Sequence, residues 1–316
     1  MHSSLFFKLF PPPKFLLMPH TGIDISDDTI SFIEYSRPIG GRKITKYGLV
    51  PLEPGIIENG DVRDEAKFIA TLAEVAEKNK LFYARLSIPE EKAYLFEIEV
   101  PPGDTETISQ NIEFKLEENI PLSAADTVFT FDLLPGDHNH PWRASVSAVP
   151  RTYIEHMISI FKKAGIVPIA FETIPRAVAR AVYYKGLDDA LIIHSMKTKT
   201  GAYIYSEGAI GFTSTIGAGS TESDISKYVD ILADEVRRVY SYWLTRNNGE
   251  NRSLKKVIVT GHNTELVTGM LRPKVSDIIQ VEEIDVWRDI LDTDNYVPPI
   301  DKIDSFDYTS AAGLAL

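Results

Sequence analysis

Several short polar stretches carry side chains that could do chemistry. Residues 137–140 read Asp-His-Asn-His, and two histidines two positions apart can bind a metal ion. Their place between two predicted strands favours a solvated hairpin loop instead. Glu90 and Glu91 form a carboxylate pair, but they follow Pro89 and are typical of a turn. We therefore predict neither a metal site nor a catalytic acid–base pair in these stretches.

A glycine-rich turn and a histidine are further candidates. Gly217-Ala218-Gly219 precedes a predicted helix, and the N-terminus of a helix attracts anions. A tight strand-to-helix turn explains this spacing equally well. His194 could act as a general base, but no nucleophile motif such as G-x-S-x-G accompanies it. A partly buried histidine at the end of a strand is the simpler interpretation, and we predict no catalytic residues.

The composition excludes some classes of function. Apolar residues make up 44% of the 316 residues and charged residues 25%, as in ordinary globular proteins. The chain has no cysteine, which excludes disulfides, thiolate metal sites and a cysteine nucleophile. The formal net charge is −12, from 45 acidic and 33 basic residues, and no dense basic stretch interrupts it. This balance argues against binding of nucleic acid.

The first twenty residues are apolar but do not form a membrane-spanning segment. Three prolines at 11–13 interrupt the apolar positions, and no charged region precedes them as in a signal peptide. Residues 1–20 are expected to be either a tail that packs on the protein's own surface or is disordered, or a docking segment for a membrane or a partner. Two lysines alone would not hold the chain on an anionic surface.

Hydrophobic periodicity predicts a mixed α/β chain. Residues 22–25, 29–35 and 43–49 are expected to be strands, and residues 64–80 an amphipathic helix. A block of strands, one helix, two strands and a second helix follows over residues 83–165, typical of a compact α+β module. Later, strands are expected at 190–194, 202–205 and 210–216. This repeats the order of strands and turns found at 22–49, so the sequence predicts a duplicated, two-lobed fold.

These landmarks resemble the PilM family of type IV pilus assembly proteins, relatives of FtsA within the actin-like ATPase superfamily. The matching pieces run in family order along residues 21–316: 22–25 (GIDI), 60–62 (GDV), 86–89 (LSIP), 112–121, 164–166 (AGI), 171–172 (FE), Gly261 and 312–316 (AGLAL). No single piece is specific, but the ordered set is.

The resemblance implies an α/β, duplicated actin-like (RNase H-like) fold of two lobes with an inserted small α+β subdomain. Residues 21–82 and 166–186 would form the first lobe, 83–165 the inserted subdomain, and 187–316 the second lobe. Family members insert an outer subdomain after the position of Gly219. Only about ten residues separate this glycine from the long helix that ends near 245. The outer subdomain is therefore expected to be truncated.

The family binds ATP and magnesium between its lobes, with an Asp-x-Gly motif in the first hairpin of each lobe. If this chain retained nucleotide binding, the resemblance would assign it to six residues: Asp24, Ser26, Thr200, Gly217, Gly219 and Gly261. The motifs depart from the family pattern, because the first hairpin has serine in place of glycine. In the second hairpin His194 replaces the carboxylate and Met196 the glycine. We therefore expect no cofactor, no bound metal and no ATPase activity.

The resemblance implies a scaffold in the cytoplasm, held at the inner face of the plasma membrane through its partners. Its main partner would be the N-terminal cytoplasmic tail of a PilN-like inner-membrane protein, bound between the first lobe and the inserted subdomain. Pilus motor ATPases would be reached indirectly, and a homo-oligomer is possible in this family. The alternatives are an ATP-binding actin-like switch or ATPase, or an FtsA-like or type II secretion adaptor.

Overall fold

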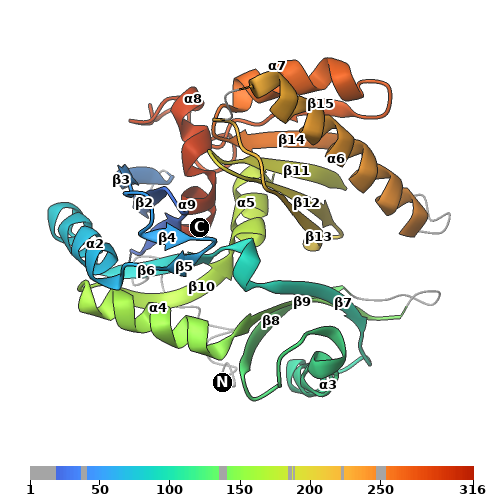
Figure 1. Cartoon of the computed structure of the whole chain (residues 1–316), viewed down its shortest axis with the longest axis horizontal. Helices are drawn as coiled ribbons and strands as arrows, with labels where there is room; N and C mark the ends of the chain where they lie inside the picture. Colours follow the sequence, from blue (N-terminus) through green and yellow to red (C-terminus); the bar gives the residue numbers. More distant parts are fainter. Residues whose placement is uncertain are drawn as a thin grey trace.

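The computed structural model describes residues 19–36, 41–134, 141–183, 187, 189–221, 224–246 and 254–316. Two lobes, each built on a five-stranded sheet, lie beside a smaller module (Figure 1). No helix in these ranges is long and apolar enough to cross a membrane. Residues 1–18 and 135–140, which include most of the tail and the Asp-His-Asn-His run, lie outside the described part of the chain.

The first lobe has a sheet with the strand order β10-β6-β1-β2-β3. Its strands are β1 (Thr21–Ile25), β2 (Thr29–Ser36), β3 (Lys43–Pro51), β6 (Tyr83–Ile88) and β10 (Val167–Thr173). Strand β1 pairs antiparallel with β2 and parallel with β6. A short hairpin, β4 (Ile57–Glu58) and β5 (Asp61–Val62), precedes helix α2 (Glu65–Asn79). Apolar residues of α2 and α4 (Arg151–Lys163) share one buried core with this sheet.

The second lobe repeats this sheet. Its order is β13-β12-β11-β14-β15, formed by β11 (Ala190–Ser195), β12 (Thr200–Ser206), β13 (Ala209–Ile216), β14 (Lys256–Gly261) and β15 (Gln280–Glu283). Strand β11 again pairs antiparallel with the next strand and parallel with a later one. Helices α6 (Ile225–Arg246) and α7 (Thr264–Val275) pack on this sheet. The predicted duplication is confirmed, because both sheets have the same order and the same strand directions.

The inserted module is smaller than the range 83–165 expected for it. Its own sheet is β7-β9-β8, formed by β7 (Tyr94–Glu99), β8 (Thr127–Leu134) and β9 (Arg143–Pro150), and α3 (Thr105–Asn119) packs on this sheet. Strand β6 lies between β1 and β10, and α4 packs in the core of the first lobe. The ends of the expected range therefore belong to the first lobe, since sheet partners and core contacts place them there.

The C-terminal region also departs from the expected division. Helix α9 (Thr309–Leu314) packs on β1 and β2 of the first lobe and against α5 (Ile174–Val182). Figure 1 shows α5 and α9 between the two sheets. A Cβ atom on Gly22 would lie 2.2 Å from the carbonyl oxygen of Ala311, and one on Gly313 would lie 1.8 Å from that of Ala177. Glycine is needed at both positions because three backbones meet there.

Short segments complete the fold. They are η2 (Glu90–Lys92), which links β6 to the module, and α8 (Lys302–Ser305) and η3 (Phe306–Tyr308), which lead into α9. Residues 217–224 connect β13 to α6.

Candidate functional site

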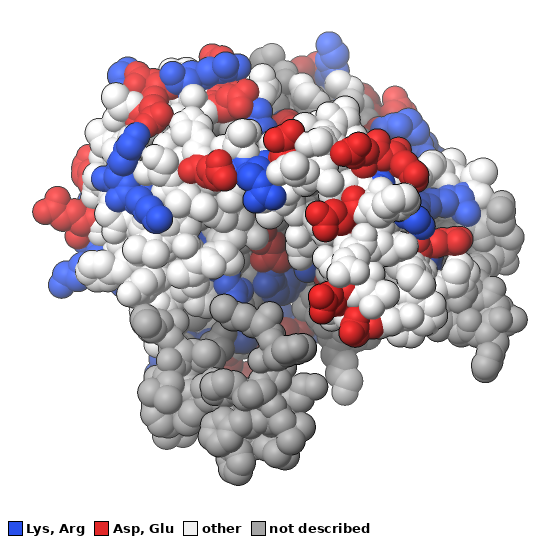
Figure 2. Space-filling model, turned by 90° about the horizontal axis from the view of Figure 1, so that it is seen from below, with Lys and Arg blue, Asp and Glu red and all other residues white. Residues whose placement is uncertain are grey.

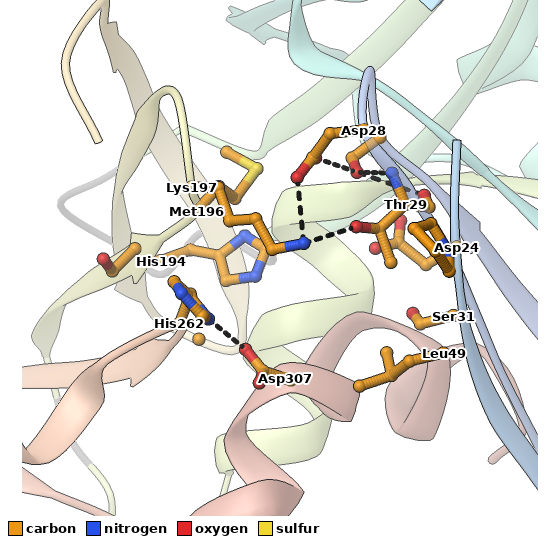
Figure 3. Close-up of a pocket in the computed structure, with 14 residues that line it drawn as sticks. Asp24, Asp28, Thr29, Ser31, Leu49, His194, Met196, Lys197, His262 and Asp307 are labelled. Atoms are coloured by element: carbon orange, nitrogen blue, oxygen red, sulfur yellow. Dashed lines mark hydrogen bonds and ion pairs between the residues drawn. The ribbon is translucent and has the colours of Figure 1, made fainter. Parts of the chain in front are cut away.

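A cleft of about 320 Å³ lies between the two lobes, where the β1–β2 hairpin faces the β11–β12 hairpin (Figure 3). Gly261 and His262, at the end of β14, and Asp307 of η3 form another wall. The remaining lining residues are Asp24, Ser26, Asp28, Thr29, Ser31, Leu49, Pro51, His194, Ser195, Met196 and Lys197. The ends of the two central strands, β1 and β11, therefore open into one cavity.

Asp24 is the last but one residue of β1 and lines the cleft. Burial raises its pKa to about 6, and the nearby carboxylate of Glu90 adds to this. A hydrogen bond with Ser87 and the charge of Lys199 act in the opposite direction. One carboxylate oxygen, Oδ1, is buried and has no hydrogen-bond partner among the described residues. Asp24 is therefore a partly desolvated carboxyl group whose ionised form is disfavoured.

The side chain of Ser26 makes hydrogen bonds within the first hairpin turn. Its Oγ accepts a hydrogen bond from the backbone N–H of Thr29 at 3.0 Å and donates one to Oδ1 of Asp28 at 2.8 Å. The serine that replaces the expected glycine thus accepts the hydrogen bond that the backbone N–H of Thr29 could otherwise donate to a ligand. A phosphate at the turn would have to displace this contact.

The second hairpin carries no carboxylate at the matching position. His194 is 6% exposed, and burial lowers its pKa to about 4, helped by the positive charge of Lys199. The imidazole is therefore neutral at neutral pH. Met196 lines the cleft, and its backbone N–H donates to the carbonyl of Lys199 within the turn. The side chains that this hairpin presents to the cleft are thus a neutral imidazole, a serine hydroxyl, a thioether and one lysine.

Lys197 reaches from the second hairpin across the cleft to the first. Its Nζ lies 3.2 Å from Oδ2 of Asp28 and donates to Oγ1 of Thr29 at 3.1 Å (Figure 3). The lysine side chain is 40% exposed and the aspartate 31%, so water screens this ion pair. Lys197 nevertheless places a cation between the two hairpins.

A second contact between the lobes lies deeper. The Lys199 Nζ lies 2.5 Å from Oε1 of Glu91, and the lysine side chain is only 11% exposed. Burial lowers the pKa of Lys199, but the charges of Glu90 and Glu91 more than offset it, so its pKa is raised. The ammonium therefore stays charged. The hydroxyl of Tyr203, on β12, donates to Oε1 of Glu90.

Gly201 makes room for this second contact. A Cβ atom there would lie 2.0 Å from the hydroxyl oxygen of Tyr203. Burial raises the pKa of the Glu90 carboxyl, although Lys199 and Tyr203 stabilise its ionised form. Sequence reasoning missed Lys197, Lys199, Gly201 and Tyr203. The one available signal was the pair of lysines in the second turn at the place where the first turn carries Asp27 and Asp28.

The structure separates the six residues assigned from the resemblance. Asp24, Ser26 and Gly261 line the cleft, and Thr200, Gly217 and Gly219 lie outside its lining. Thr200 is fully buried, where its Oγ1 donates to the carbonyl of Ala218 at 2.9 Å and contacts the hydroxyl of Tyr228 at 2.8 Å. Its hydroxyl supports the interior of the second lobe.

Two of these glycines are required by close backbone contacts. A Cβ atom on Gly219 would lie 2.3 Å from the carbonyl oxygen of Lys197, and one on Gly261 would lie 2.1 Å from that of Ser195. Gly261 also has a φ of +95°, which side-chain-bearing residues rarely adopt. Gly217 differs, because nothing lies within 4 Å of the place of its Cβ. A tight turn therefore explains Gly219, whose alternative role as an anion cradle was left open by the sequence.

The carboxylate pair predicted to lie in a turn does so, in the 3-10 segment η2. Glu90 and Glu91 nevertheless both make contacts between the lobes, with Tyr203 and Lys199 of the second lobe. Across the described residues there is no group of three or more histidine and acidic side chains placed to hold a metal ion.

No protein-family model and no curated protein matches the chain. Its structure is nevertheless similar to known ones. A chain of the PilM–PilN type IV pilus biogenesis complex superposes with a TM-score of 0.77 at 15% identity, covering 94% of this chain and 98% of that one. The ethanolamine utilization protein EutJ from Carboxydothermus hydrogenoformans superposes with a TM-score of 0.53 at 14% identity, covering 96% and 90%. The chain has an actin-like fold.

The actin-like fold implies ATP and magnesium between the lobes, and the residues present fit this pair poorly. Magnesium needs oxygen ligands, but Asp24 is partly desolvated, Asp28 and Asp307 are paired with Lys197 and His262, and the second hairpin offers an imidazole where a carboxylate is expected. Lys197 is engaged by Asp28, and Ser26 occupies the Thr29 amide. The carboxylates of the cleft would also repel a triphosphate that has no metal ion.

This actin-like molecule has a second concave site, a groove of about 330 Å³ where both lobes and the module meet. It is lined by Asp132 of the module, by Glu172, Arg176, Ala179, Arg180 and Tyr183 of the first lobe, and by Tyr205, Gly208, Ala209 and Ile210 of the second. Asp132 and Arg176 form an ion pair of 2.7 Å between the module and α5. The rings of Tyr183 and Tyr205 meet edge to face, 5.8 Å apart.

Proposed function

We propose that the chain is a scaffold of a type IV pilus, or of a related secretion system, that binds the cytoplasmic tail of a PilN-like inner-membrane protein. The observation that carries the proposal is the similarity to a chain of the PilM–PilN complex over nearly the full length of both chains. The similarity includes the region of the inserted module. We propose a location at the inner face of the membrane, where the bound tail would tether the chain and link it to the pilus motors.

The groove beside the module is the proposed site for the tail. An extended peptide needs pockets for alternate side chains and polar groups for its backbone. Tyr183 and Tyr205 offer aromatic surface, while the paired side chains of Arg176 and Asp132 offer a donor and an acceptor. Figure 2 shows acidic and basic side chains interspersed over one face of the molecule, without the broad basic surface of a nucleic-acid binder.

The test is direct binding of a labelled peptide. The peptide carries the N-terminal cytoplasmic residues of a PilN-like inner-membrane protein from the same organism, and fluorescence anisotropy follows its binding to the full chain. Tyr183→Ala is expected to raise Kd about tenfold, since this ring is 46% exposed in the groove. Tyr242→Ala is the matched control, because this ring is 43% exposed and contacts Phe212 on the far side of the second lobe. No retention of the peptide at 100 µM, roughly −5.5 kcal/mol of binding, would sink the proposal.

We further propose that the scaffold works without nucleotide. A ligand at 100 times its Kd adds about 2.7 kcal/mol to the free energy of unfolding. A titration with Mg-ATP is therefore expected to leave the melting temperature unchanged. A saturable rise in melting temperature would favour the alternative, an ATP-binding actin-like switch.

A further inference from the structure

We propose that Lys197 and Lys199 replace the nucleotide-held metal ion, so that the protein's own cations keep the lobes closed and the groove formed. The part that concerns the groove rests on the proposed function. The closure of the lobes is independent of it.

The outer contact links the tips of the two hairpins. Lys197 comes from the second lobe, and its partners Asp28 and Thr29 come from the first. Figure 3 shows the lysine chain extended across the cleft toward both partners. This is the space between the two central hairpins, where a bound ligand of the fold would bridge the lobes. Here a side chain makes the bridge.

The inner contact is more buried. Lys199 lies against Glu91, and Tyr203 donates to Glu90, so that β12 of the second lobe is joined to η2 of the first. Oε2 of Glu90 is buried and finds no partner among the described residues. Without the lysine, the buried carboxylate of Glu90 would lose a nearby cation, with the more exposed carboxylate of Glu91 beside it. The inner contact therefore opposes separation more strongly than the exposed outer one.

The charges of the cleft explain why cations are needed. Asp24 and Asp28 line it from the first lobe and Asp307 lines its other wall, while the carboxylate of Glu90 lies near Asp24 outside the lining. Like charges that approach each other oppose closure. Two ammonium groups provide the same total charge as one Mg²⁺ ion. They do so on side chains that belong to the second lobe and cannot diffuse away.

The groove depends on the same closure. Its walls come from both lobes and from the module, as the residues Arg176, Tyr205 and Asp132 show. Segment η2, which holds Glu90 and Glu91, leads directly into the first strand of the module. Helix α5, which leads into Tyr183, shares a buried core with the second lobe, so a shift of the second lobe relative to the module would move Tyr205 and Tyr183 away from Asp132 and open the groove. Closure by the lysines therefore presents the groove ready for a partner.

The experiment measures the distance between the lobes in the full chain. The protein has no cysteine, so Glu77→Cys on α2 and Glu265→Cys on α7 can carry a single pair of spin labels, both at exposed positions. Pulsed electron resonance then gives the distance distribution. A narrow distribution that Mg-ATP does not change is expected for the parent chain. In the double variant Lys197→Met and Lys199→Met, which keeps side-chain length but not charge, it is expected to broaden and shift to longer distances.

Lys274→Met is the matched control. Lys274 pairs with Asp230 at 2.6 Å within the second lobe, so its loss breaks an ion pair without touching the cleft, and the distribution should not change. If the double variant does not fold, Lys197→Met alone and 1 M salt serve instead. Salt shortens the screening length from about 10 Å at 0.1 M to about 3 Å, so it should broaden the parent distribution.

The inference is overturned if the double variant, or the single variant with salt, keeps the parent distribution. It is also overturned if Mg-ATP shifts the parent to shorter distances. The tail peptide is expected to bind the double variant at least tenfold more weakly. If the parent chain does not bind the peptide, the proposed function fails, but the distance measurement still decides whether the lysines close the lobes.

Discussion

The two central hairpins of the molecule occupy equivalent places in equivalent sheets, yet their chemistry is opposite. The β1–β2 turn carries Asp27 and Asp28, and the β11–β12 turn carries Lys197 and Lys199. Hydrogen bonds from other segments of the same lobe also fix each turn. Asp27 accepts from the backbone N–H groups of Asn59 and Gly60, while residues after Gly219 donate to the carbonyls of the second turn.

This difference shows that equivalent turns of a duplicated fold can carry complementary charges and contact each other. In a nucleotide-binding arrangement both hairpins would face a shared ligand, and both would need donors for phosphate and oxygens for the metal. Here Lys197 of one copy pairs with Asp28 of the other, and we propose that this contact takes the place of such a ligand. Both sheets have the same strand order and each is packed on an apolar core, whereas the two turns that face the cleft carry opposite charges.

The largest expected effect is a difference in stability between alanine substitutions at two glycines of the second lobe. Gly219→Ala should lower the free energy of unfolding by about 3 kcal/mol, because its Cβ would meet the carbonyl oxygen of Lys197. Gly217→Ala, the control, should change it by less than about 0.5 kcal/mol, because the space around that position is open. Urea unfolding of both variants measures this. Equal effects would mean that the turn is not held by backbone contact.

The next effect concerns the first hairpin and depends on pH. The folded state raises the pKa of Asp24 from its ordinary 3.8 to about 6, so it binds the proton more tightly than the unfolded chain. The carboxyl group therefore favours folding below pH 3.8, and this contribution is lost as the pH rises through 6. Asp24→Asn should raise the free energy of unfolding at pH 7.5 by about 2 kcal/mol.

The sign of this difference is the decisive readout. The gain should shrink as the pH falls below 6 and vanish near pH 4, as followed by urea unfolding at several pH values. A loss of stability in Asp24→Asn at pH 7.5 would indicate that the ionised carboxylate makes favourable contacts in the cleft.

The smallest expected effect tests the closed turn of the first hairpin. Ser26→Ala removes the acceptor of the Thr29 amide and the donor to Asp28, and should lower the free energy of unfolding by about 1 kcal/mol. Ser26→Gly restores the residue expected in the nucleotide-binding family. It should bind Mg-ATP no better than the parent in a thermal titration, because the second hairpin remains without a carboxylate. Binding gained by this single change would show that Ser26 alone blocks the site.

Most of the fold could be predicted because its signals are local. The sequence predicts strands at residues 22–25 and 210–216, and these match β1 and β13. The duplication was visible in the spacing of strands and turns. Sheet partners were not, since the sequence of β6 does not say that it lies between β1 and β10. The first strand of the expected module therefore proved to belong to the lobe beside it.

The site was harder to predict because it depends on pairs that are far apart in the chain. Asp24 and Ser26 were found, because a motif places them at the end of a strand. Lys199 and Glu91 are 108 positions apart, and no local pattern joins them. Gly201 matters only because Tyr203 folds its hydroxyl toward that position. Such contacts arise from the approach of two lobes, which periodicity does not encode.

The position of helix α9 has a consequence for biosynthesis. The face of the first sheet that receives Ala311 and Ala312 stays exposed until residues 309–314 have left the ribosome, long after β1, β2 and β3. The apolar surface of β1 and β2 that packs on α9 therefore stays exposed to solvent until α9 has been synthesised. A nascent chain stalled before residue 309 would be a natural client for a chaperone that shields such surface.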